Sequence, residues 1–147
     1  MTMGKDYFNG KKVIHRTTSG VTGALNAFKN SDEVLLASYM NAHATAEYIK
    51  CCNPELVSIV AMGIRSMERA PEDELCGDYI ESLLTGGDYD HLKAVHKILA
   101  HETAQKFLRG DKPYLPKEDP EICLQRNLVD FTLIVKKQGN LLLSIKI

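Results

Sequence analysis

The residues with the clearest chemical potential form a short turn near the N-terminus, Thr17-Thr18-Ser19-Gly20, with Arg16 directly before it. The turn follows the apolar pair Val13-Ile14 and precedes a helix-like run, so we expect a strand to end and a helix to begin there. Hydroxyl groups can hydrogen-bond to phosphate oxygens, glycine lets the backbone approach a ligand, and helix N-termini attract anions. Arg16 would add a guanidinium fork. The turn suits an anion site, although a plain helix cap explains it equally well.

A second group consists of the carboxylates Glu72, Asp73 and Glu74, which follow Pro71 at an expected helix start. Carboxylate oxygens together with waters can hold Mg²⁺. The same residues also suit the positive end of a helix dipole, which is the simpler explanation of their position. Arg65 lies in the preceding loop, and loops after parallel strands line the ligand crevice of open α/β sheets. A metal site and a dipole-favoured helix start both remain open here.

Asn41 follows the second expected strand, residues 33–38. At that position its amide would reach the same crevice. Asn41 is equally well explained as the N-cap of the helix that follows.

The histidines do not form a metal site. His91, His96 and His101 are spaced by five residues, which places successive side chains about 140° apart around a helix, so they cannot share one ion. His101-Glu102 begins the zinc-binding H-E-x-x-H pattern, but Gln105 stands at the second ligand position.

Composition excludes several classes of protein. The 147 residues carry a net charge of −1 with scattered Lys and Arg, so we expect no nucleic-acid partner. No apolar run approaches the roughly 18 residues of a membrane helix, and we expect no membrane partner. The four cysteines form no C-x-x-C pair and are expected to be free thiols in a reducing cytoplasm: Cys51, Cys52, Cys76 and Cys123.

Extended and helical patterns alternate along the chain, which is typical of a parallel sheet with helical crossovers. Expected strands span 11–17, 33–38 and 56–62, and a hairpin pairs 131–136 with 141–147. Expected helices span 21–29, 42–51, 71 to the glycines at 86–87, 88–108 and 121–126. The run at 56–62 is almost wholly apolar, as expected of a strand that is covered on both faces.

These elements predict the fold class. We expect an α/β protein with a three-layer α/β/α arrangement, a mixed, mainly parallel sheet and a C-terminal antiparallel hairpin. Residues 1–147 are expected to form a single domain. Residues 1–10 are expected to be a leader or a cloning remnant.

Taken in order, several motifs resemble the 2-phosphosulfolactate phosphatase family of coenzyme M biosynthesis. The residues that carry the resemblance are Gly10-Lys11-Lys12-Val13-Ile14, Thr17-Thr18-Ser19-Gly20, Ser38-Tyr39-Met40-Asn41-Ala42, Ala46-Glu47-Tyr48-Ile49, Val60-Ala61-Met62-Gly63 and Glu72-Asp73-Glu74-Leu75-Cys76. Ser19 and Val21 stand where the family usually carries asparagine and threonine. The family's N-terminal aspartate-valine-(leucine or phenylalanine)-arginine-alanine signature and its glycine-asparagine-serine-proline stretch do not occur here. The chain therefore resembles the C-terminal part of a longer family chain.

The resemblance implies Mg²⁺-dependent hydrolysis of the phosphate monoester of a small sulfonated hydroxy acid. On this hypothesis, Glu72 and Asp73 take the metal and acid–base roles. The residues expected to hold the phosphorylated or sulfonated anion are Arg16, Thr17, Thr18, Ser19, Gly20, Asn41 and Arg65.

A competing hypothesis is that the chain is a non-catalytic part of such a protein. It would fold, bind an anion at most, and form a homodimer through an unusually apolar surface.

Overall fold

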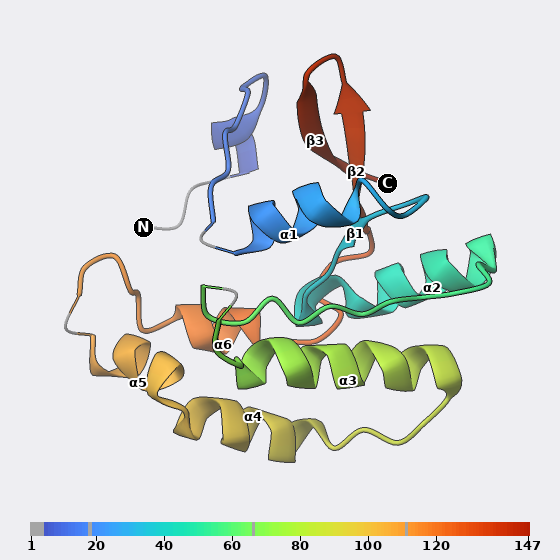
Figure 1. Ribbon diagram of the computed structural model, residues 1–147. Coiled ribbons are helices and arrows are strands. Elements are labelled where there is room, and N and C mark those ends of the chain that lie inside the picture. Colours follow the sequence, from blue (N-terminus) through green and yellow to red (C-terminus); the bar gives the residue numbers. More distant parts are fainter. Residues whose placement is uncertain (1–4, 18, 66, 111) are drawn as a thin grey trace.

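The computed structural model describes residues 5–17, 19–65, 67–110 and 112–147 (Figure 1). The chain combines helices with a small sheet, which confirms the mixed α/β class. Within the described residues, no helix has the length and apolar character needed to cross a membrane.

Helix α3, Pro71–Thr85, is the central helix of the helical part. Pro71 stands in its first turn with three acidic residues, and Gly86 ends it in a left-handed conformation with φ of 77°, as the sequence predicts. Helix α2, Ala42–Cys52, packs against one side of α3, and helix α4, His91–Ala100, packs against another. Their shared core contains Tyr39, Ala42, Cys76, Tyr79, Ile80 and Ile98.

The predicted helix over 88–108 is two helices, α4 and α5, Glu102–Arg109. Asp90 begins α4 by accepting a hydrogen bond from the Lys93 N–H at 3.0 Å. His101 separates the two helices with an extended backbone, ψ 144°, and its Nδ1 accepts from the Thr103 N–H at 3.4 Å. The side chain of Gln105 closes the break by donating to the Leu99 carbonyl at 2.6 Å. The short helix α6, Asp119–Cys123, begins two residues before its predicted start.

The sheet has three strands in the order β1-β2-β3: Leu35–Leu36, Leu133–Gln138 and Leu141–Lys146. Both pairings are antiparallel, with Leu35 opposite Ile134 and Ile134 opposite Ile145. The C-terminal hairpin is therefore confirmed. The mainly parallel sheet and the three-layer arrangement are not formed by the described residues, because strand 33–38 shortens to β1 and pairs with the hairpin instead.

Two predicted strands are absent as strands among the described residues. Residues 11–17 and 56–62 run as drawn-out segments outside the sheet (Figure 1). Ile14 is 96% exposed and Leu56 is 81% exposed. An apolar run predicts burial between two layers, but a strand also needs a neighbouring backbone to pair with, and no described segment supplies one.

Helix α1, Gly20–Ala27, forms where the sequence predicts it, directly after the Thr-Ser-Gly turn. It contacts the apolar segment, residues 54–62, through a close approach of Gly23 to Met62. A Cβ on Gly23 would stand 2.3 Å from the Met62 sulfur, so a larger residue there would displace the Met62 side chain.

Candidate functional site

The turn before α1 contains one residue that caps the helix. The Thr17 Oγ1 accepts a hydrogen bond from the Val21 N–H at 3.0 Å, which satisfies one of the free N–H groups of the first turn. A Cβ on Gly20 would lie 3.1 Å from the same oxygen. The cap interpretation is therefore correct for Thr17. Arg16 is exposed, and Thr18 lies outside the described residues.

Ser19 behaves differently from Thr17. Its side chain is 5% exposed, and its Oγ has no hydrogen-bond partner among the described residues. A buried hydroxyl without a partner costs about 1–3 kcal/mol, so such groups call for an explanation. An anion at the N-terminus of α1 would provide an acceptor for this hydroxyl.

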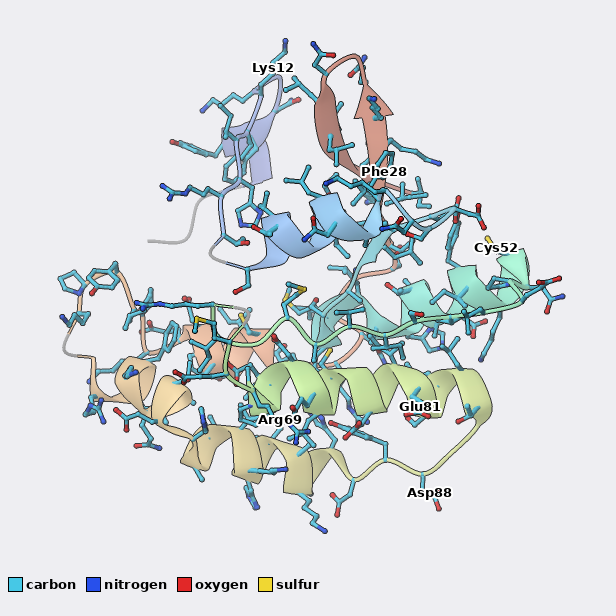
Figure 2. All side chains as sticks on the ribbon, viewed as in Figure 1. Lys12, Phe28, Cys52, Arg69, Glu81 and Asp88 are labelled. Carbon is cyan, nitrogen blue, oxygen red and sulfur yellow. The ribbon has the colours of Figure 1, made fainter. Side chains whose placement is uncertain are left out.

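Of the three carboxylates at the start of α3, two are held by the loop before the helix. Asp73 accepts a hydrogen bond from the Gly63 N–H through Oδ2 at 2.7 Å. Glu74 pairs with Arg69, whose side chain is 87% exposed. Arg69 lies just before α3 (Figure 2). Among the described residues, no hydrogen bond reaches the Glu72 carboxylate or the Asp73 Oδ1. Asp73 therefore joins helix and loop and keeps one oxygen available.

The loop between the apolar segment and α3 is tightly shaped. Gly63 has φ of 67°, and a Cβ there would stand 2.2 Å from the Glu68 carbonyl oxygen, so only glycine fits. Ile64 and Glu68 pair through two backbone hydrogen bonds of 2.9 and 3.2 Å. Arg65 sits at the tip with φ of 55° and is exposed to solvent.

The two candidate regions are joined through consecutive residues. Met62 packs on Gly23 in α1, and the next residue, Gly63, is held by Asp73 in α3. The beginning of α1 and the beginning of α3 lie on the same side of the molecule in Figure 1. The structure thus links the Ser19 turn to Asp73 by two contacts.

Asn41 is committed to its own turn. Its Oδ1 accepts from the Ser38 N–H at 2.8 Å and from the Ser38 hydroxyl at 3.1 Å, and its Nδ2 donates to the Leu36 carbonyl at 3.1 Å. The side chain is 4% exposed, and it makes no cap hydrogen bond to α2. Asn41 therefore occupies the N-cap position of α2, as predicted, but its amide fixes the turn between β1 and α2 instead of bonding to the helix.

Cys76 lies one turn after Asp73 and is packed in the helical core. Burial, with a smaller contribution from the charge of Asp73, raises the pKa of this thiol to about 12. The thiol therefore stays protonated at neutral pH and is no nucleophile. The four cysteines are free, as predicted.

Sequence reasoning missed a polar cluster inside the helical part. The Tyr39 and Tyr89 hydroxyls lie 2.6 Å apart, Tyr89 donates to the Leu75 carbonyl, and Asn127 donates to the Tyr79 hydroxyl at 2.8 Å. Burial raises the pKa of the Tyr39 and Tyr89 phenols. These residues are far apart in the sequence and share no motif, so no sequence signal could have grouped them.

The profile of the family described as 2-phosphosulpholactate phosphatase matches residues 1–138. This chain belongs to the 2-phosphosulfolactate phosphatase family. The first ten residues lie inside the part that matches the family.

Relatives in this family carry the name probable 2-phosphosulfolactate phosphatase. The protein of Bacillus subtilis (strain 168) is 30% identical over 132 residues, which is 88% of this chain and 56% of the relative. The protein of Clostridium perfringens (strain SM101 / Type A) is 30% identical over 90% of this chain and 57% of its own length. The chain therefore spans little more than half the length of these relatives. No solved structure matches it.

Proposed function

We propose that this chain contributes the anion-binding part of a phosphatase and hydrolyses the phosphate monoester of a small sulfonated hydroxy acid, 2-phosphosulfolactate. Water would add to phosphorus as the ester P–O bond breaks, and the products are sulfolactate and inorganic phosphate. The observation that carries this proposal is the buried, unpartnered Ser19 hydroxyl at the start of α1, in a chain of the 2-phosphosulfolactate phosphatase family.

The substrate is a compact polyanion, and the turn offers matching groups. The Ser19 hydroxyl would donate to a phosphate or sulfonate oxygen at the positive end of the α1 dipole. Exposed Arg16 and Arg65 stand before α1 and at the tip of the 63–69 loop, and either guanidinium would neutralise charge on the ligand. Thr17 would act indirectly by holding the first turn of α1 in place.

The carboxylates at α3 suit a Mg²⁺ site of the kind in which one or two carboxylates bind the ion together with waters and substrate phosphate. The donor set is the Asp73 Oδ1 and Glu72, neither of which is used by a described residue. Among the described residues there is no group of three or more His, Cys, Asp or Glu placed to hold a metal alone. Mg²⁺ would lower the cost of negative charge that develops on the phosphoryl group. We place this reaction in the cytoplasm, in keeping with four free thiols.

The test is phosphate release from 2-phosphosulfolactate with and without Mg²⁺, on the 147-residue chain and on Asp73→Asn. The asparagine keeps an oxygen for the Gly63 N–H but loses the charge, so the loop should persist while turnover falls by 100-fold or more, on the order of 3 kcal/mol. Asp78→Asn, the same change at an exposed position of α3, is the matched control. Full activity of the Asp73→Asn, Glu72→Gln double variant would remove both residues from the mechanism.

A second candidate is a non-catalytic part that binds the anion or forms a homodimer. The exposed apolar segment before α3 favours it, because Leu56 and Val60 are 81% and 69% exposed. Phosphate binding without turnover in a well-folded sample would support this alternative.

A further inference from the structure

The chain exposes more surface than a folded protein of its mass. Its accessible surface is 11,072 Å², whereas a compact monomer of 16.4 kDa exposes about 7,500 Å². The excess is therefore about 3,500 Å². A protein–protein interface of ordinary size takes roughly 800 Å² from each partner, so the excess corresponds to several such patches.

Part of this surface lies on the apolar segment, which we define as residues 54–62. Leu56 and Val60 point away from the molecule with 81% and 69% of their surface exposed. No residue of the segment makes a backbone–backbone hydrogen bond to another described residue. Backbone N–H and C=O groups in folded proteins are nearly always paired, and a row of free ones is a template for a further strand.

The opposite side of the apolar segment already lies against α2 and α3. Val57 and Ile59 line a shallow hollow together with Ile49 of α2 and Leu84 of α3. Gly77 of α3 lies beneath Ile59, where a Cβ would be 3.2 Å from the Ile59 methyl carbon. Figure 1 shows the segment running along these helices from the end of α2. Val57 and Ile59 therefore lie against the helices with 39% and 42% of their surface exposed, whereas Leu56 and Val60 on the other side are 81% and 69% exposed.

The composition of the apolar segment fits pairing rather than exposure. No charged residue interrupts the run from Leu56 to Ile64. Exposed edge strands are normally protected by charges, bulges or proline within the strand. The segment at 11–17 also exposes apolar side chains, with Val13 63% and Ile14 96% exposed and no strand partner among the described residues, but it carries Lys11, Lys12 and Arg16.

We propose that residues 54–62 are a strand-docking site, and that the occupant is the stretch of polypeptide that the family relatives carry and these 147 residues do not match. That stretch amounts to more than two fifths of the relatives, since the matches cover 56% and 57% of their lengths. Its apolar strand would hydrogen-bond alongside the segment and cover Leu56 and Val60. A second copy of this chain fits less well, because one dimer interface of ordinary size would leave most of the excess surface bare.

Docking at this segment would also bear on the candidate site. The segment ends at Met62, which contacts Gly23 of α1 and precedes the Gly63 that Asp73 holds. Pairing would fix the position of Met62 and thereby the spacing between the two helix N-termini. Docking of the relatives' strand at residues 54–62 is independent of whether the chain hydrolyses a phosphate ester.

The test mixes the 147-residue chain with the part of the Bacillus subtilis relative that it does not match, made as a separate polypeptide. Light scattering after size exclusion gives the stoichiometry, and hydrogen exchange reports on residues 54–62. We expect a one-to-one complex in which the amides of 54–62 exchange roughly 100-fold more slowly than in the free chain. The matched and unmatched parts of the Bacillus subtilis relative, made separately, are the positive control.

Two variants locate the contact. Leu56→Lys should weaken the complex at least tenfold, while Leu92→Lys, the same change at a 74% exposed position of α4, should leave it intact. The proposal is overturned if the unmatched part of the Bacillus subtilis relative associates with the matched part but does not bind this chain. It is also overturned if the free chain is a homodimer with residues 54–62 protected, because a second copy would then be the occupant.

Discussion

The helical part and the apolar segment of this protein both carry large aliphatic side chains, but these side chains end in opposite states. Ile80 and Ile98 of α3 and α4 are 5% and 3% exposed, whereas Leu56 and Val60 of the segment are mostly exposed. A helix satisfies its own backbone and needs only a packing surface, which α2, α3 and α4 provide for one another. A strand needs another backbone as well. The difference shows that the helices pack without a further partner, whereas the apolar segment still needs a backbone to pair with.

The largest effect is expected where the helical core is opened. Ile98→Ala removes a side chain that is 3% exposed and should lower the free energy of unfolding by about 2–5 kcal/mol. Val60→Ala, at a 69% exposed position, should change it by less than about 0.5 kcal/mol. Urea denaturation of both variants measures the contrast. Equal losses would show that the apolar segment is buried in solution.

The loop that joins the two regions should be nearly as sensitive. Gly63→Ala forces a Cβ against the Glu68 carbonyl in a left-handed backbone, and should cost about 2 kcal/mol or more. Gly139→Ala is the matched control, because Gly139 has a similar φ of 61° in the hairpin turn but open space around the added carbon. If the two variants unfold at the same urea concentration, the close approach of Gly63 to Glu68 does not exist in solution.

A smaller effect is expected at the start of α1. Thr17→Val removes the hydroxyl that accepts from the Val21 N–H and should cost about 1 kcal/mol. Thr22→Val makes the same change at an exposed position within α1. Thermal unfolding of the pair separates the cap from the general effect of valine in a helix, and a Thr22→Val loss as large as that of Thr17→Val would rule out the cap.

The smallest effect concerns pH. Burial, with the nearby charge of Arg126, lowers the pKa of the His91 imidazole. The unfolded chain then takes up this proton at higher pH than the folded chain, so stability is fully present above the ordinary value of about 6.5 and falls as pH drops through the lowered pKa. His91→Gln should flatten that part of the stability profile, and His96→Gln, exposed on the same helix, should not. A wild-type profile that rises toward acid pH would contradict the assignment.

Local signals in the sequence were sufficient for α3 and the hairpin. Pro71, the acidic first turn and Gly86 delimit α3, and the Gly139 turn joins two apolar strands. The break at His101 was not predictable from periodicity, because the apolar pattern continues across it and a side-chain contact from Gln105 stabilises it.

The sheet and the site were less accessible to sequence reasoning. The apolar pair Val13-Ile14 and the apolar run at 56–62 signal strands, but pairing depends on residues distant in the chain, and β1 pairs with the hairpin instead. Asp73 was identified from its position at a helix start, and the structure adds its contact with Gly63. The sequence could not show which of the two hydroxyls, Ser19 or Thr17, has no hydrogen-bond partner. That outcome depends on the exact path of the turn, and a hydroxyl-rich composition does not define the path.

The central claim is that the apolar segment has no pairing partner among the described residues, whereas α2, α3 and α4 pack on one another. Native-state hydrogen exchange on the 147-residue chain alone tests it most directly. We predict that amides of residues 56–62 exchange at rates within about tenfold of an unstructured peptide, while those of Cys76 to Leu84 in α3 are slowed by more than roughly 1,000-fold. Protection of 56–62 comparable to that of α3 in a monomeric sample would contradict the account.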